Sequence, residues 1–398
     1  MPNRYRYLLS RLYNVLSGVI LGLMFIFAKR RKTIILNSNH NNSFNHNSKY
    51  LFSYLYQNSI IKSEYDIYYV LNDEQKRNEL NDIFPGKHFI SNKGFGNKIL
   101  ILKASFWFCS TLETPVGGIF LSFRRKVIHL GHGMPYKNVG FLERDCSLIK
   151  RIYYTFNNSN FSKFLSVSDF FDPVIEGAFN IGSHKVLRLP QPRADAVLRL
   201  PYINNALTIK EKEVLGEIES NASLNILYAP TWRHFSDVRL FPFAESLEDV
   251  NDFLVENNII VWLRPHPFFD FDISSILSFS NIKKMGSEEL EDINLALSAF
   301  DGLLTDYSSL FFDFMLLQRK VGFLDYDIKE YIEQIGLVNQ FEKIKVGDSL
   351  ESFHEFKEFC SNIKEPGYDL SKVELTNYLE YQGYGSASEY VLSQIIND

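Results

Sequence analysis

The chain has only three cysteines, Cys109, Cys146 and Cys360, and they lie far apart in the sequence. An odd, scattered set gives neither a disulfide framework nor a metal knuckle, so a reducing cytoplasmic location fits best. Positive charge is not in excess either, because 42 Lys and Arg against 47 Asp and Glu leave a formal net charge of −5. This balance argues against a general nucleic-acid binder. The sequence shows no short-period repeat and no low-complexity tract beyond an Asn-rich stretch at 37–48, whose composition alone requires no special role.

Length and periodicity predict a two-domain α/β protein. With 398 residues and 45% hydrophobic content, the chain is too long for one ordinary core. From Thr33 onward, apolar runs alternate with polar loops and helical patterns, which is typical of parallel sheets with helices on both faces. We expect a first lobe at 33–192, a hinge at 193–205 and a second lobe at 206–398. The predicted strands are 33–36, 66–71, 88–91, 106–110, 126–130, 164–168 and 185–189, then 225–229, 259–263, 281–284, 301–304 and 321–324.

Residues 1–32 form a separate N-terminal segment. Its apolar part, 12–28, lies between basic clusters, and no small-x-small cleavage site precedes the second cluster, Lys29 to Lys32. A helix of this length, at about 1.5 Å per residue, falls slightly short of a bilayer core of about 30 Å. Positive charge at both ends favours a helix lying in or dipping into the cytoplasmic leaflet. A membrane span and an ordinary packed helix are the alternatives.

The most informative stretch is Gly302 to Ser309, in the second lobe. An apolar run there ends at hydroxyls and a carboxylate, and a helical pattern begins at Leu310. Ser308 or Ser309 is a natural N-cap, so free backbone N–H groups and hydroxyl donors would gather at one point. Such a helix start suits a phosphate. The alternative is a capped helix with no ligand. Asp306 is more typical of a loop-organising carboxylate than of a ligand.

Other strand ends carry cations and histidines. His132 lies between two glycines after the strand at 126–130, which makes it a candidate base because histidine titrates near neutral pH. Lys137 follows it and either lies on the surface or holds a phosphate. In the second lobe, strand ends supply Thr231 and Arg233, then Arg264 and His266. Each of these has a structural alternative, a buried ion pair or a capped turn, but a pyrophosphate explains their convergence better.

The ordered set HGMPYK, LPQPRAD, YAPTWR, RPHP and TDYSSLFFDFMLLQRKVGFLDYD resembles the CDP-glycerol glycerophosphotransferase family, the primases and polymerases of teichoic acids. Relatives of this family also work in capsule and lipopolysaccharide assembly. The likeness covers about 33–331, and it implies the GT-B fold, with two Rossmann-like lobes around a cleft. It implies attachment to the membrane surface as well, because the family's acceptor is a lipid-linked glycan. The resemblance departs at Met134 and Tyr136, and at 336–347, which lack the family pattern.

The resemblance also implies roles for individual residues. His132 resembles the catalytic histidine of the family, and His266 its second essential histidine. Gly133 and Lys137 would lie on the acceptor side. The donor-side residues would be Thr231, Arg233, Arg264, Thr305, Ser308, Ser309 and Asp313.

The implied reaction is phosphoryl transfer from a CDP-alditol, glycerol by default, to a hydroxyl of a lipid-linked or polymer glycan, with release of CMP. No acidic pair with metal-ligand spacing appears at the cleft, so we expect neither a metal nor another cofactor, and no nucleic-acid partner. Two other functions stay open: a GT-B glycosyltransferase that uses a nucleotide sugar, and a catalytically inactive nucleotide-binding scaffold.

Overall fold

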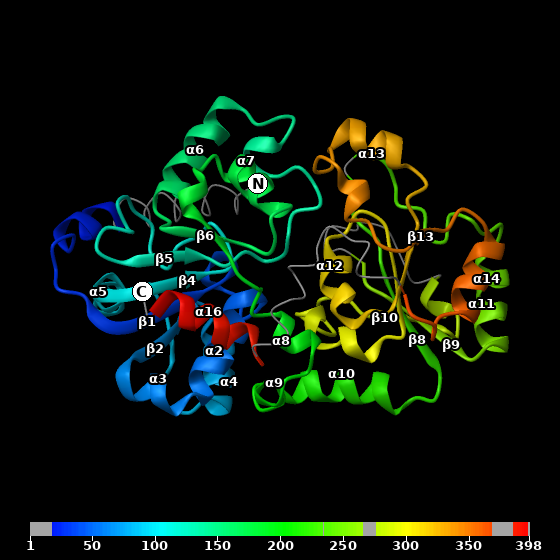
Figure 1. Ribbon diagram of the computed structural model, residues 1–398. Helices are drawn as coiled ribbons and strands as arrows, with labels where there is room; N and C mark the ends of the chain where they lie inside the picture. Colours follow the sequence, from blue (N-terminus) through cyan, green and yellow to red (C-terminus); the bar gives the residue numbers. More distant parts are fainter. Residues whose placement is uncertain (1–17, 234, 266–275, 368–384, 397–398) are drawn as a thin grey trace, which may run out of the picture.

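The computed structural model describes residues 18–233, 235–265, 276–367 and 385–396, which form two lobes, each built on an all-parallel sheet (Figure 1). The strand order is β3-β2-β1-β4-β5-β6-β7 in the first sheet and β10-β9-β8-β11-β12-β13 in the second. In each sheet the first strand in the sequence lies in the middle, and the next two strands extend the sheet to one edge. The remaining strands then extend it on the other side of the first strand. This is the doubly wound order that places ligands at the carboxyl ends of the strands.

All twelve predicted strands are confirmed. Those of the first sheet are β1 (Arg31–Asn37), β2 (Asp66–Val70), β3 (Phe89–Ile90), β4 (Ala104–Cys109), β5 (Lys126–His129), β6 (Lys163–Ser166) and β7 (Val186–Arg188). Those of the second are β8 (Leu224–Ala229), β9 (Ile259–Leu263), β10 (Ile282–Lys284), β11 (Gly302–Thr305), β12 (Lys320–Phe323) and β13 (Asp348–Ser349). Only the last, two residues long, was not predicted. The central strands β1 and β11 are buried along their apolar runs, which is why their sequences read as continuous hydrophobic stretches.

Helices cover both sheets. In the first lobe they are α2 (His46–Gln57), α3 (Ser59–Glu64), α4 (Glu74–Ile83), α5 (Phe95–Lys103), α6 (Leu148–Ser159), α7 (Phe171–Phe179), α8 (Ala194–Val197) and α9 (Pro201–Asn204). In the second they are α10 (Ile209–Ser220), α11 (Leu247–Glu256), α12 (Leu310–Phe314), α13 (Ile328–Gln334) and α14 (Phe353–Ser361). The predicted helix after Ser309 is α12, continued by a 3-10 turn, η7 (Met315–Leu317).

The last helix, α16 (Ala387–Ile396), returns to the first lobe, although the sequence-based boundary places it in the second. It packs against the core of the first sheet, and Figure 1 shows it beside α2 and α8. Asp195, from the predicted hinge, accepts hydrogen bonds from the backbone N–H groups of Ala387 (2.7 Å) and Ser388 (2.9 Å). A buried carboxylate therefore caps this helix and fixes its place.

The described part of the N-terminal segment has one packed face and one exposed face. Leu21 is buried, and a Cβ at Gly18 would lie 1.6 Å from the Gly117 carbonyl oxygen, so this helical turn lies directly on the first lobe. Met24 and Phe27 point outward and are 69% and 75% exposed. Residues 12–17 of the predicted membrane helix lie outside the described residues. Within the described ranges, no helix is long and apolar enough to cross a bilayer.

The two lobes touch across the cleft through aromatic side chains and a short ribbon. Tyr136 packs edge-to-face on Phe311, with ring centroids 5.0 Å apart. Lys137 pairs with Leu337 in an isolated antiparallel bridge. These contacts bring the loop after β5 up against α12.

Candidate active site

A cavity of about 350 Å³ lies between the carboxyl ends of the two sheets. Both lobes contribute charged and polar side chains to it. The lining includes His46, His132, Lys137, Arg193, Thr231, Arg264, Asp292, Asn294, Ser308, Ser309 and Asp313. The predicted convergence of strand ends is therefore present for most of the predicted residues.

His132 is carried by a tight loop directly after β5. Gly131 and Gly133 adopt φ values of 74° and 140°, which side chains disfavour. A Cβ at Gly133 would lie 2.9 Å from Arg193 Nη2 and 3.4 Å from Ser309 Oγ. Glycine is thus required where the His132 loop meets the second lobe.

The surroundings of His132 keep its imidazole neutral. The side chain is exposed on the cavity side, and the protein around its other side desolvates it and lowers its pKa. The charge of Arg193 lowers the pKa further, while a hydrogen bond to the backbone carbonyl of Ser110 acts in the opposite direction. Because the ring N–H is donated to that carbonyl, the second ring nitrogen keeps its lone pair. A neutral, oriented imidazole in a cavity can accept a proton from a hydroxyl.

Arg193 and Asp313 form a buried ion pair beside this histidine. Arg193 Nη2 lies 2.7 Å from Asp313 Oδ2, and Nη1 donates to the His132 carbonyl at 2.7 Å. Burial raises the pKa of Asp313 to about 6, and Arg193 opposes that rise. The resemblance assigns Asp313 to the donor side. The structure places it beside Arg193 and the His132 loop, with Oδ1 buried and without a hydrogen-bond partner among the described residues.

The Asn-rich stretch supplies two residues that sequence reasoning missed. Asn47 Nδ2 donates to the carbonyls of Leu130 (3.0 Å) and Gly131 (2.9 Å), and Asn47 Oδ1 accepts from the Arg193 N–H (3.0 Å). The Asn47 side chain therefore fixes the backbone of the His132 loop through hydrogen bonds from the first lobe. His46 lines the cavity with its ring centroid 5.5 Å from that of His132, and burial lowers its pKa to about 3.

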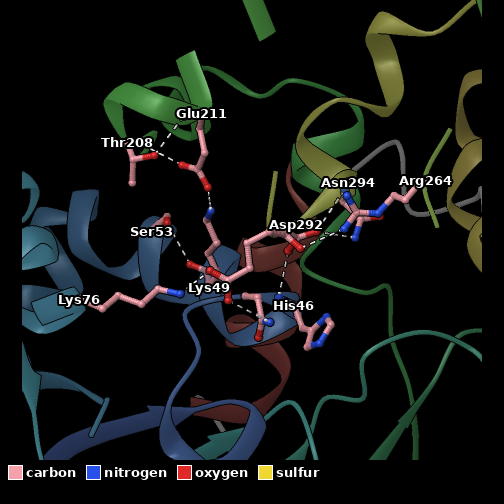
Figure 2. Close-up of polar contacts among 11 residues, drawn as sticks. His46, Lys49, Ser53, Lys76, Thr208, Glu211, Arg264, Asp292 and Asn294 are labelled. Atoms are coloured by element: carbon pink, nitrogen blue, oxygen red, sulfur yellow. Dashed lines mark hydrogen bonds and ion pairs between the residues drawn. The ribbon is translucent and has the colours of Figure 1, made fainter. Parts of the chain in front are cut away.

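A loop of the second lobe, 287–294, reaches across to this same corner (Figure 2). Asp292 Oδ2 accepts the backbone N–H of His46 at 3.0 Å, which stabilises that residue's φ of 58°. Arg264 holds the loop from below, because its guanidinium donates to the carbonyls of Met285 (3.0 Å) and Leu290 (2.9 Å). Arg264 thus lines the cavity as predicted, but its donors are largely used by backbone.

Ser308 and Ser309 begin α12 and line the cavity, as predicted. Ser308 Oγ accepts the Leu310 N–H at 3.3 Å, whereas the Ser309 side chain makes no capping bond. The Ser309 hydroxyl is therefore the one that the helix leaves for a ligand. Thr231 Oγ1 is buried without a hydrogen-bond partner among the described residues, and it lines the same cavity. Both hydroxyls suit an anionic oxygen.

Two predicted donor residues do not line the cavity. The Arg233 side chain is fully buried, and it pairs with Asp306 (3.0 Å) and Asp327 (2.5 Å). Thr305 is buried in β11 and donates to the Ala229 carbonyl at 2.9 Å. Asp306 accepts the Thr231 N–H at 2.9 Å, which confirms its predicted loop-organising role. Arg233, Thr305 and Asp306 thus stabilise the ends of β8 and β11 from the protein interior. His266, the second predicted histidine, lies outside the described residues.

Lys137 is the clearest cation for a bound phosphate. It lines the cavity, and its ammonium forms no ion pair with the described residues. Burial lowers its pKa to about 8, while the nearby Asp306 charge raises it. At neutral pH this half-buried side chain is therefore charged, and it lines the cavity without an ion-pair partner among the described residues.

Comparison with known proteins agrees with this geometry. The model of the CDP-glycerol:poly(glycerophosphate) glycerophosphotransferase family matches residues 21–397. The chain belongs to this family. It is therefore an enzyme of the glycerophosphotransferase type.

Individual relatives of this glycerophosphotransferase are distant but extend over most of its length. The chain is 26% identical to the teichoic acid poly(glycerol phosphate) polymerase of Bacillus spizizenii, covering 99% of this chain and 98% of the relative. It is 23% identical to the teichoic acid ribitol-phosphate polymerase TarK of Staphylococcus aureus, covering 92% and 69%. The solved structure of the wall teichoic acid polymerase TagF superposes with a TM-score of 0.66 at 19% identity, covering 100% and 98%. That superposition confirms the GT-B fold.

Lys137 gives this glycerophosphotransferase a testable pH dependence. Its ammonium is charged below a pKa of about 8 and neutral above it, so a contact with a donor phosphate would be lost as pH rises through that value. We expect kcat/KM for CDP-glycerol to fall on the alkaline side of about pH 8. Lys137→Arg should remove this fall, since arginine stays charged. Steady-state CMP release across pH measures both, and an unchanged alkaline limb in Lys137→Arg would show that another group titrates.

Proposed function

We propose that this chain transfers a glycerol-phosphate, or a related alditol-phosphate, from a CDP-alditol to a hydroxyl of a lipid-linked or polymer glycan, in the synthesis of teichoic acid or a related cell-envelope polymer. One observation carries the proposal. A neutral imidazole, His132, lines one cavity with a lysine that has no ion-pair partner among the described residues and with the Thr231 and Ser309 hydroxyls, in a chain of this family. A base and an anion-binding wall facing each other are the two elements that phosphoryl transfer from a diphosphate requires.

In the proposed reaction, an acceptor hydroxyl oxygen attacks the phosphorus that carries the alditol. His132 takes the hydroxyl proton, and the bond from that phosphorus to the bridging oxygen of the diphosphate breaks. The electron pair leaves with CMP, and the new phosphodiester joins alditol and acceptor. Lys137, Thr231 and Ser309 are placed to stabilise the negative charge that spreads over the phosphoryl and departing oxygens.

We infer that the reaction needs no metal ion. The charge on the diphosphate can be balanced by Lys137 and by hydroxyl and backbone donors at the ends of β8 and β11. A chelator should then leave CMP release unchanged, and a loss of rate that Mg²⁺ restores would contradict this inference.

The base assignment predicts a specific loss. His132→Ala should lower kcat for CMP release by at least about 100-fold, because a positioned general base contributes about 10²–10⁴. Binding of CDP-glycerol, measured by calorimetry, should stay within a few-fold of the unsubstituted enzyme. His184→Ala, an exposed histidine outside the cavity, is the matched control. Normal turnover in His132→Ala would refute the assignment.

We also propose that the enzyme works at the surface of the cytoplasmic membrane, through an exposed apolar face on the first lobe. Helix α6 presents Leu148, Ile149, Ile152, Tyr153 and Phe156 on one side, all of them exposed. Their spacing follows one helical face, and Lys150 and Arg151 flank it. An apolar face with basic flanks is typical of a helix that lies in a membrane interface.

This face continues beyond α6. Ser122 and Asn160 join the end of α6 to the loop that carries Phe120 and Phe123, through hydrogen bonds to Ser159 and Gly118. Phe27 of the N-terminal segment lies edge-on to Phe123, at a centroid distance of 6.0 Å. The apolar patch therefore runs from α6 to the N-terminal turn, and exposed patches of this kind mark interaction sites.

Charge placed in this face should weaken membrane binding. Ile149→Glu replaces an apolar contact with a charge that anionic headgroups repel. The lost apolar contact and the added repulsion each weaken the free energy of membrane binding by about 1 kcal/mol or more. We expect at least about tenfold weaker cosedimentation with vesicles of phosphatidylglycerol. CMP release with a soluble acceptor should not change. Ile209→Glu on α10 is the control, because the two isoleucines are 80% and 78% exposed. Equal binding by both variants would exclude α6 as the membrane contact.

A further inference from the structure

A second and larger cavity, of about 680 Å³, lies between the lobes on the side of α7 and α13. Its first-lobe wall is the start of α7 with Asp169 and Phe170, and its second-lobe wall is the turn at Val338, Asn339 and Gln340. Figure 1 shows α7 and α13 facing each other across the gap between the lobes. The volume is within the range of about 300–1,000 Å³ that is usual for ligand sites. None of the residues proposed to act in the transfer reaction lines this cavity.

The two cavities share one wall. Residues 136–138 of the first lobe pair with 336–338 of the second, through hydrogen bonds from the Asn138 N–H to the Gly336 carbonyl (3.1 Å) and from the Val338 N–H to the Tyr136 carbonyl (3.1 Å). Neighbouring side chains on such an extended ribbon point to opposite sides. Lys137 accordingly lines the catalytic cavity, and Asn138 lines the larger one. A molecule bound in the larger cavity thus lies one residue away from the phosphate-binding lysine.

The lining of the larger cavity differs in chemistry from that of the catalytic one. The residues that line it include Asn138, Asn339, Gln340 and Asp169, together with the aromatic Phe170. No lysine or arginine is among the described residues that line it, whereas the catalytic cavity has Lys137, Arg193 and Arg264. Amides and carboxylates hydrogen-bond hydroxyls, and a ring covers the apolar face of a sugar, so the lining suits a neutral polyhydroxylated ligand rather than a phosphate.

The position of the larger cavity links it to the apolar face. Leu142, in the 3-10 turn η2 (Gly140–Leu142), lines the cavity. The next residue, Glu143, is held by α6, because it accepts hydrogen bonds from Lys150 (2.9 Å) and Tyr154 (3.2 Å). The cavity therefore lies directly beside the helix that we assign to the membrane surface.

We infer that this larger cavity binds the neutral sugar portion of the acceptor, and so delivers the acceptor hydroxyl over the Lys137–Asn138 ribbon to His132. The inference rests on the proposed function, which it deepens by locating the acceptor. The charged parts of the donor and product would then bind in the catalytic cavity, and the uncharged glycan would bind in the larger cavity.

The test compares two acceptors in one CMP-release assay with CDP-glycerol as donor. One acceptor is a disaccharide on a short alkyl diphosphate, long enough to occupy both cavities, and the other is free glycerol, which reaches only His132. Asn339→Trp fills the larger cavity from an exposed position, and Asp169→Ala removes its carboxylate. Asn204→Trp, at an exposed asparagine on a different cavity of about 310 Å³, is the matched control.

We expect Asn339→Trp to raise KM for the disaccharide acceptor by at least about tenfold, and Asp169→Ala to raise it by about threefold or more, since tenfold corresponds to about 1.4 kcal/mol. The KM for CDP-glycerol and the rate with free glycerol should stay unchanged, as should every value for Asn204→Trp. A disaccharide KM in Asn339→Trp equal to that of the control would overturn the inference. If the unsubstituted enzyme released no CMP with either acceptor, the proposed function itself would fail instead.

Discussion

The buried ion pair between Arg193 and Asp313 is the contact on which the site depends. Arg193 comes from the connection between the lobes, Asp313 from α12 of the second lobe, and the Arg193 guanidinium also holds the carbonyl of His132. Both charged side chains are at least 95% buried, so each would be costly without the other. One interaction therefore joins the hinge, the loop that carries His132 and the helix that follows Ser308 and Ser309.

This arrangement brings a neutral imidazole and a cation to the same cavity between the lobes. Partial desolvation and the charge of Arg193 lower the pKa of His132, and desolvation gives Lys137 a pKa of about 8, so a neutral imidazole and a cation line the same cavity. Fixed charges that desolvated walls partly shield from solvent act more strongly than charges in open water. Asn47 and Asp292 stabilise the same corner from two directions, one within the first lobe and one across the cleft.

The sequence predicted the sheets well because buried parallel strands are continuous apolar runs that end at polar clusters. The same logic placed His132, Lys137, Thr231 and Ser309 in one cavity. The sequence could not distinguish residues that line the cavity from residues that are buried next to it. Arg233 was therefore assigned to the donor, although its side chain is buried in ion pairs with two carboxylates. The distinction depends on which partners tertiary packing supplies.

Other site residues were missed because their roles arise only from contacts between distant segments. Asn47 and His46 belong to the Asn-rich stretch, whose composition alone indicated no special role. Asp292 belongs to a loop without helical or strand periodicity. Arg193 was placed in a hinge, although the motif LPQPRAD that contains it could have identified it. The packing of the C-terminal helix on the first lobe could not be predicted, because a helical pattern does not specify which lobe covers its apolar face.

A double-mutant cycle on the Arg193–Asp313 pair, with kcat/KM for CMP release from CDP-glycerol as the measured quantity, tests most directly whether this contact positions His132. If the pair positions His132 as a unit, Arg193→Gln and Asp313→Asn should each lower kcat/KM by about tenfold or more, and the double variant should be little worse than the poorer single one. Losses that simply multiply in the double variant would show that the two residues act independently, and would contradict the central role given to their contact.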